Sequence, residues 1–208
     1  MTGAPVVFVI DDDPSVRTSL KFLISTVGLQ VESFDSAEAF LRGKLSDGPS
    51  CLVLDVRLRG MSGLDFQREL AARNIRTPIV FITGHGDIPM SVRAMKAGAV
   101  EFLTKPCRDQ DLLDAIRIAL ERDRARCDQE KDATELQQRF ASLTPREREV
   151  VSMVVSGMLN KQIAGQLGTA ENTVKVHRSR AMEKMHAQSL ADLVRMVEKL
   201  KHPSPKAA

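Results

Sequence analysis

Polar side chains of the kinds that bind metal ions and phosphate follow four apolar, strand-like runs of this sequence. They are Asp11 and Asp12 after residues 6–10, Asp55 after 51–54, Thr83 after 79–82, and Lys105 after 100–103. If the runs are parallel strands, these groups meet at one edge of a sheet, where open α/β sheets bind ligands. Clustered carboxylates repel one another unless a hard cation lies between them, and Mg²⁺ takes one or two carboxylates while leaving room for a phosphoryl oxygen. The pattern predicts a phosphoryl-transfer site with an aspartate nucleophile.

The first 121 residues contain the elements that would position these groups. Strand signals, including one at 31–34, alternate with segments in which apolar residues recur at helical spacing. Helices are expected to begin at the N-cap residues Asp13, Ser36, Ser62 and Asp109, and another is expected over 88–97. Five strands alternating with five helices predict a parallel, doubly wound α/β sheet.

The remaining residues carry only helical signals. Residues 122–141 contain neither proline nor glycine and have dense charge of both signs, so the fifth helix is expected to continue as an exposed helical linker. Beyond it, Thr144 begins a capping box, Asn160 caps a second helix, Gly168 makes a tight turn before a third at 171–185, and Ser189 opens a fourth. These are helix-turn-helix proportions. Residues 202–208 are expected to be frayed.

Charge is divided unevenly along the chain. Residues 1–121 contain 14 Lys and Arg against 16 Asp and Glu, whereas residues 142–208 contain 11 against 6. The basic part is therefore expected to meet a polyanion. The three cysteines are an odd number and contain no CxxC pair, so they do not suggest a disulfide framework. No apolar run approaches the ~20 residues of a membrane span. The segment before Asp11 is too short to hold the regions of a signal peptide. We expect a reduced, cytoplasmic protein without membrane association.

The motifs in this order resemble two known domain families. Val9-Ile10-Asp11-Asp12-Asp13, Asp55-Val56-Arg57-Leu58, Met61-Ser62-Gly63, residues 82–87 and Lys105-Pro106 resemble the receiver domain of bacterial two-component response regulators. Residues 143–199 resemble the LuxR-type helix-turn-helix, and the combination resembles FixJ-type regulators of the NarL class. The resemblance implies a flavodoxin-like receiver at 1–121, a helical linker at 122–141 and an all-α, four-helix DNA-binding domain at 142–201.

The resemblance also implies how phosphate is accepted. Asp55 would be phosphorylated by a sensor histidine kinase. Mg²⁺ would be held by Asp12, Asp55 and the backbone carbonyl of Arg57, with Asp11 acting through water. Lys105 would pair with a phosphoryl oxygen, because an ammonium neutralises charge on the transferring oxygens.

The response to phosphate is implied at a second group of residues. Thr83 would turn its hydroxyl toward the phosphate, and Phe102 would change its rotamer with Thr83. Resembling regulators dimerise through the surface next to this pair, and here Val92 offers an apolar contact while Lys96 and Glu101 could pair across a two-fold axis. Phosphorylation would then give a homodimer that binds double-stranded DNA, contacts RNA polymerase and activates transcription.

The third C-terminal helix can be analysed from its periodicity. At about 100° per residue, Val174, Ala181, Met182 and Met185 fall on one face. The opposite face carries Asn172, Lys175, Val176, Ser179 and Arg180. An exposed valine among polar and basic groups suits a helix in the major groove, and Lys175, Val176 and Ser179 are the candidates for base contacts. Further DNA contacts are expected from Thr173, and phosphate contacts from Lys161, His177, Arg178 and Lys184.

Some positions depart from the family pattern, and two other functions compete. Arg59 replaces a usual proline, which would loosen the loop after Asp55, and Cys107 replaces a usual phenylalanine. His85 is expected to be a solvent-exposed loop residue. An aspartyl-phosphate phosphatase would need a second acid where Arg57 stands. A constitutive DNA binder would need a degenerate receiver, and the acidic residues, Thr83 and Lys105 disfavour that.

Overall fold

A computed structural model describes residues 3–43, 46, 48–84 and 86–201. The described chain divides into two compact units between Asp128 and Gln129. The expected frayed tail at 202–208 and the loop residue His85 lie outside the described residues.

The first unit is built on a five-stranded parallel sheet. Its strands are β1 (Val6–Ile10), β2 (Gln30–Phe34), β3 (Ser50–Asp55), β4 (Ile79–Thr83) and β5 (Glu101–Thr104), in the spatial order β2-β1-β3-β4-β5. Every neighbouring pair is parallel. The central strands β1, β3 and β4 are buried along their whole length, as parallel strands covered on both faces must be. The predicted doubly wound fold is confirmed.

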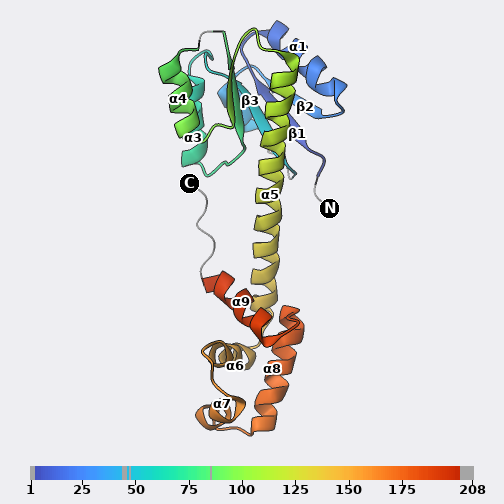
Figure 1. Cartoon of the computed structure of the whole chain (residues 1–208), viewed down its shortest axis with the longest axis vertical. Helices are drawn as coiled ribbons and strands as arrows, with labels where there is room; N and C mark the ends of the chain where they lie inside the picture. Colours follow the sequence, from blue (N-terminus) through green and yellow to red (C-terminus); the bar gives the residue numbers. More distant parts are fainter. Residues whose placement is uncertain (1–2, 44–45, 47, 85, 202–208) are drawn as a thin grey trace. The chain divides into compact units, whose positions relative to one another are not determined.

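Helices cover both faces of this sheet (Figure 1). They are α1 (Pro14–Thr26), α2 (Ala37–Arg42), α3 (Gly63–Ala72), α4 (Ile88–Lys96) and α5 (Asp109–Ala141). Alternate residues of β1 point to the two faces: Phe8 packs in one apolar cluster with Phe40 of α2 and Phe66 of α3, whereas Val9 packs in another with Ile24 of α1 and Ile116 of α5.

Most helix starts agree with the sequence prediction. Asp13, Ser36 and Ser62 each accept a backbone N–H as N-caps, which satisfies one of the amides left unpaired at a helix start. Asp109 is a correction, because it is the first residue inside α5 and Arg108 precedes the helix. Helix α5 then continues without interruption through 122–141, as the lack of proline and glycine predicted.

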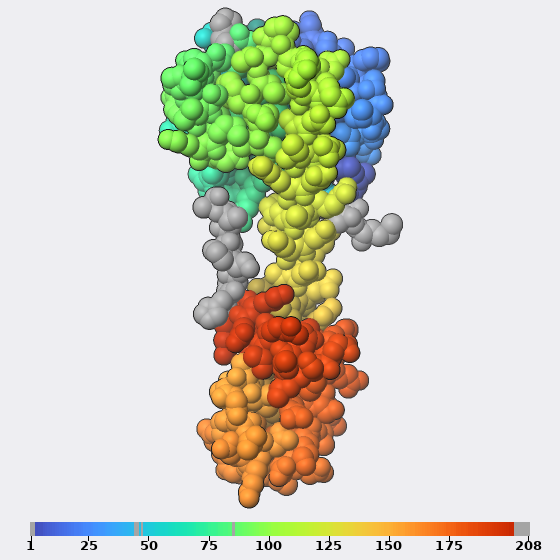
Figure 2. Space-filling view, viewed as in Figure 1, coloured from blue at the N-terminus to red at the C-terminus, as the bar shows by residue number. Residues whose placement is uncertain are grey.

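The second unit is entirely helical. It contains the end of α5, then α6 (Pro145–Val155), α7 (Asn160–Leu167), α8 (Glu171–Met185) and α9 (Leu190–Lys201). Their inward faces form one apolar cluster that includes Val150, Ile163, Val174 and Leu193. Figure 2 shows the side chains of these orange and red helices packed against one another on the face drawn.

The helix-turn-helix begins differently from the prediction for Asn160. The N-cap of α7 is Leu159, whose N–H donates to the side chain of Gln162 at 2.8 Å. Asn160 is the first helical residue, and its side-chain oxygen accepts a hydrogen bond from Arg178 of α8. Gly168 ends α7 with φ 61°, in the left-handed region where a glycine costs no strain. The Asn160 side chain therefore joins α7 to α8 and does not cap α7.

In the described part of the chain, no helix combines the length and the apolar character needed to cross a membrane.

Candidate phosphoacceptor site and nucleic-acid interface

The carboxyl edge of the sheet brings the predicted acids and lysine together. Asp11 follows β1, Asp55 and Thr83 end β3 and β4, and Lys105 follows β5. The Lys105 Nζ lies 2.6 Å from Asp11 Oδ2 and 2.9 Å from Asp55 Oδ2. The side chain of Asp11 is 1% exposed, so one ammonium joins two shielded carboxylates. The convergence of these side chains, predicted from the ends of the apolar runs, is present.

Burial and pairing act in opposite directions on these charges. Burial raises the pKa of the Asp11 carboxyl above its ordinary value, although the hydrogen bond from Lys105 opposes the rise. Burial alone would lower the pKa of Lys105, but hydrogen bonds to Asp11 and Asp55 outweigh it and raise that pKa. Lys105 therefore stays positively charged at neutral pH, as a partner for phosphoryl oxygens must.

The loop after β3 fits closely around the Asp55 backbone. The Asp55 carboxylate accepts a hydrogen bond from the Arg57 N–H at 3.0 Å, and Gly63 N–H donates to the Val56 carbonyl at 2.8 Å. A Cβ at Gly63 would lie 2.4 Å from the Asp55 carbonyl oxygen, so no other residue fits without a shift of the backbone. The motif contained Gly63, but its close approach to Asp55 depends on the tertiary fold and has no local sequence signal.

Arg59 contacts Asp12 across the same edge. The Arg59 Nε lies 3.0 Å from Asp12 Oδ2, with side chains 88% and 29% exposed. From the sequence, Arg59 was expected only to loosen the loop after Asp55. The pair joins residues 47 apart in the sequence, so local pattern could not reveal it.

A hollow of about 330 Å³ opens at this edge. Asp11, Asp12, Asp55, Arg57, Thr83 and Lys105 are among its lining residues. Among the residues that the structure describes, no three acidic, histidine or cysteine side chains gather closely enough to hold a metal ion on their own. Mg²⁺, however, needs only one or two carboxylates, with water and a substrate oxygen as its other ligands. An oxygen-only set of two carboxylates and the Arg57 carbonyl fits that requirement in its chemistry.

The predicted switch residues, Thr83 and Phe102, both lie close to Gly86 in the loop before α4. Phe102 is half-buried, with its ring centroid 6.1 Å from that of Phe81. A Cβ at Gly86 would lie 2.8 Å from Phe102 Cε1 and 3.2 Å from Thr83 Cγ2. The loop between β4 and α4 therefore passes directly over both Phe102 and Thr83, and a glycine is the residue that allows it.

The expected dimer surface is accessible on the isolated chain. Val92 is 43% exposed, and Lys96 and Glu101 are exposed. Glu101 accepts a hydrogen bond from the Phe102 N–H at 3.0 Å, which satisfies a backbone amide on the edge strand β5. Cys107 is half-buried against the apolar cluster under α5, and burial raises the pKa of its thiol, so it behaves as a packing residue.

Helix α8 has the two faces that its periodicity predicted. Val174, Ala181 and Met185 are buried. The exposed face carries Asn172, Thr173, Lys175, Val176, Ser179 and Arg180, with Lys161 also exposed at the start of α7. The N-cap of α8 is Ala170, which makes no side-chain capping hydrogen bond. Its exposed face has the side chains that base and phosphate contacts require.

Three residues of the expected phosphate-binding set have other environments. Lys184 Nζ lies 2.7 Å from Glu147 Oε2, and Glu147 is almost fully buried at the start of α6. Arg178 donates to Asn160 of α7, and His177 Nδ1 is buried without a hydrogen-bond partner among the described residues. Lys184 thus joins α6 to α8, and its expected contact with DNA phosphate stays a prediction. Glu147 was expected only as a capping residue.

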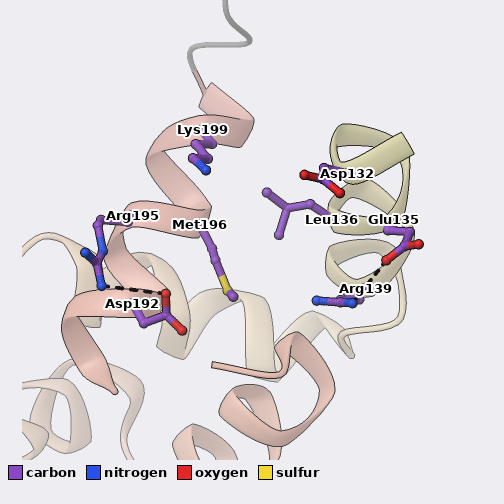
Figure 3. Close-up of a pocket in the computed structure, with 8 residues that line it drawn as sticks. All are labelled: Asp132, Glu135, Leu136, Arg139, Asp192, Arg195, Met196 and Lys199. Atoms are coloured by element: carbon purple, nitrogen blue, oxygen red, sulfur yellow. Dashed lines mark hydrogen bonds and ion pairs between the residues drawn. The ribbon is translucent and has the colours of Figure 1, made fainter. Parts of the chain in front are cut away.

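A larger hollow, of about 460 Å³, lies within the second unit between α5 and α9 (Figure 3). Leu136 and Met196 point into it, and charged residues of both signs surround them. Arg139 pairs with Glu135 at 3.2 Å, and Arg195 pairs with Asp192 at 3.8 Å. Three acidic and three basic side chains line this hollow in all, so its charges offset one another, and its size alone does not make it the chemical site.

Comparisons with known proteins agree with this geometry. The model of the response regulator receiver domain matches residues 7–117, and that of the bacterial regulatory proteins of the luxR family matches residues 141–197. Nodulation protein W of Bradyrhizobium diazoefficiens is 56% identical over 94% of this chain and 86% of its own length. Transcriptional regulatory protein FixJ of Azorhizobium caulinodans is 45% identical over 91% of this chain and 90% of its own length.

Solved structures show the same likeness. The response regulator StyR has a TM-score of 0.87 and 52% identity, covering 95% of this chain and all of its own. Full-length FixJ from B. japonicum has a TM-score of 0.55 and 38% identity, covering 97% of this chain and 98% of its own.

Proposed function

The chain belongs to the response regulators that join a receiver domain to a LuxR-type DNA-binding domain, and on this basis we propose that Asp55 accepts phosphate from a sensor histidine kinase. Residues 1–121 are proposed as the receiver, 122–141 as a helical linker and 142–201 as the DNA-binding domain. The protein is a transcriptional regulator of this family, and we propose that phosphorylation makes it a dimeric activator.

The observation that carries this proposal is the Lys105 ammonium, which lies within 2.9 Å of both Asp11 and Asp55 at the opening of the hollow. An Asp55 oxygen would attack the phosphorus of a phosphohistidine, the bond from phosphorus to the imidazole nitrogen would break, and the nitrogen would leave with the kinase. Lys105 would turn from Asp55 to a phosphoryl oxygen as the acyl phosphate forms. Bound at Asp12, Asp55 and the Arg57 carbonyl, Mg²⁺ would supply further neutralisation of the phosphoryl charge.

The signal would pass from the site to α4 and β5. Thr83 would turn toward the acyl phosphate and leave space that the Phe102 ring can enter, because both side chains lie against Gly86. The surface of Val92, Lys96 and Glu101 would then dimerise. Two joined receivers raise the effective concentration of two DNA-binding domains at paired half-sites, which strengthens binding without any new base contact. We expect this function in the cytoplasm, where the DNA and the proposed RNA polymerase partner lie.

The rival reading as a phosphatase has no support in the site. An aspartyl-phosphate phosphatase would need a carboxylic acid two residues after its nucleophile as general acid and base. The residue in that position is Arg57, whose N–H donates to Asp55. The receiver therefore promotes only its own phosphorylation and dephosphorylation.

Replacing the nucleophile tests the proposal. Asp55→Asn should abolish Mg²⁺-dependent incorporation of labelled phosphate from acetyl phosphate, because an amide oxygen is not a nucleophile at neutral pH. The control Asp65→Asn alters an exposed acid of α3 that pairs with Arg68, and it should be labelled like wild type. Circular dichroism would show that both variants are folded. Label retained by folded Asp55→Asn would move the phosphoacceptor elsewhere.

A further inference from the structure

Three carboxylates at the phosphoacceptor edge, those of Asp11, Asp12 and Asp55, are each paired with a cationic side chain. Lys105 pairs with Asp11 and Asp55, whereas Arg59 pairs with Asp12 through a contact of 3.0 Å between Nε and Oδ2. Lys105 is the phosphate partner in the proposed function. Arg59 has no part in that function, although its guanidinium contacts a carboxylate proposed to bind the metal.

Two cations cannot share Asp12 at low cost. A guanidinium and a divalent ion in contact with one carboxylate would repel each other, and Arg59 Nε already donates to Oδ2. Arg17, another arginine at this edge, donates its hydrogen bond to the Asp11 backbone carbonyl and not to a carboxylate.

Arg59 can leave its position easily. Its side chain is 88% exposed, and exposed ion pairs contribute little to stability, so water can replace the carboxylate at little cost. Gly60, with φ 88°, turns the loop immediately after it. An exposed, weak and reversible pair at a metal ligand is suited to competition with the metal.

We propose that Arg59 is an internal competitor of Mg²⁺: its guanidinium holds Asp12 in the metal-free protein and must release it before the ion binds. This inference rests on the proposed metal site. It makes Arg59 a positioning residue that sets the Mg²⁺ concentration at which Asp55 becomes a phosphate acceptor. A proline or alanine at this position would leave Asp12 without this competitor.

Calorimetric titration of the full chain with MgCl₂ at low ionic strength tests the inference. Arg59→Ala should lower the Mg²⁺ dissociation constant about three- to fivefold, the range that an exposed ion pair allows. Arg59→Lys keeps the charge and should stay closer to wild type than Arg59→Ala. The control Arg73→Ala removes an exposed pair with Glu69 on α3 and should leave the dissociation constant unchanged.

Salt provides a second readout. Added NaCl screens the exposed pair between Arg59 and Asp12, so the difference between wild type and Arg59→Ala should narrow as salt rises. Equal dissociation constants for folded wild type and Arg59→Ala at low salt would overturn the inference, as would weaker binding by Arg59→Ala. If wild type bound Mg²⁺ and were labelled at Asp55 in that case, the proposed function would stand and only the role of Arg59 would fail. A wild-type chain that bound no Mg²⁺ would overturn the proposed metal site itself.

Discussion

At the scale of single residues, three lysines with the same chemistry have three different environments. Lys105 lies between two acids at the sheet edge, Lys184 joins two helices through buried Glu147, and Lys175 lies exposed on α8 beside Glu171. The positions of Lys105 at the sheet edge and of Lys175 on the exposed face of α8 agree with the sequence prediction. The contact of Lys184 with Glu147 was not predicted, because the two residues are 37 positions apart in the sequence.

The exposed face of α8 leads to a prediction about DNA. Lys175→Ala should weaken binding at the specific site by about 1–3 kcal/mol and relax base preference there, because a base-edge contact discriminates sequence. The matched change Lys161→Ala should weaken all sequences alike and reduce the salt slope by about one, as loss of a phosphate contact does. Fluorescence anisotropy with specific and random duplexes at several salt concentrations measures both. Equal losses on the two duplexes for Lys175→Ala would place the base-reading residues elsewhere.

At the scale of elements, the strand ends and the helix starts were both predicted to within one residue. Strand ends are marked by the change from apolar to polar residues, which is a local signal. Asp109 and Asn160 were each predicted as caps but lie inside their helices. Any polar residue near a helix start resembles a cap, and only contacts across the fold, such as Arg178 to Asn160, decide its use. The pair of Arg59 with Asp12 escaped prediction for the same reason.

Helix α5 is anchored to strand β3 by a buried acid. The Asp123 carboxylate is 0% exposed, accepts a hydrogen bond from the Ser50 N–H at 2.8 Å and pairs with Arg126. We expect Asp123→Ala to lower the free energy of unfolding by about 1–3 kcal/mol, since it leaves a buried N–H unsatisfied. Asp128→Ala, at an exposed position of the same helix, is the control and should have little effect. Urea denaturation followed by circular dichroism compares them, and similar losses would show that Asp123 has no special role.

The contact between α6 and α8 should depend on pH. The hydrogen bond from Lys184 lowers the pKa of Glu147 below its ordinary value of 4.5. A lowered pKa in the folded state means that the ionised pair stabilises the fold above pH 4.5 and that this contribution is lost as pH falls through the folded pKa. Wild type should therefore have a higher melting temperature than Glu147→Gln at pH 7, and the difference between the two melting temperatures should shrink below pH 4.5.

Calorimetric melting between pH 7 and pH 3 would follow this difference. Glu149→Gln, which removes an exposed partner of Arg146, is the control and should show a smaller difference at pH 7. A gap between wild type and Glu147→Gln that stayed constant to pH 3 would mean that the charge of Glu147 contributes nothing.

At the scale of the whole molecule, we expect the chain to be monomeric until Asp55 is modified. Sedimentation velocity should show a dimer with beryllofluoride, and Val92→Asp should prevent it by placing a charge in the apolar contact. Ile118→Asp, at an exposed position of α5, is the matched control and should still dimerise. Glu101→Lys should weaken the dimer, and adding Lys96→Glu should restore part of it, because such pairs set register more than affinity. Monomers in the presence of beryllofluoride would favour release of an inhibitory contact between the two units.

The strand order of the sheet also determines how the chain reaches this structure. Strand β1 pairs with β2 and β3, and no two neighbouring strands are joined by a hairpin, so each pairing must wait for a helical connection to close. The second unit packs short helices that follow one another closely in sequence. Proteins dominated by local contacts fold faster than those dominated by distant pairings. We therefore expect the DNA-binding unit, although synthesised last, to fold on a shorter timescale than the receiver that controls it.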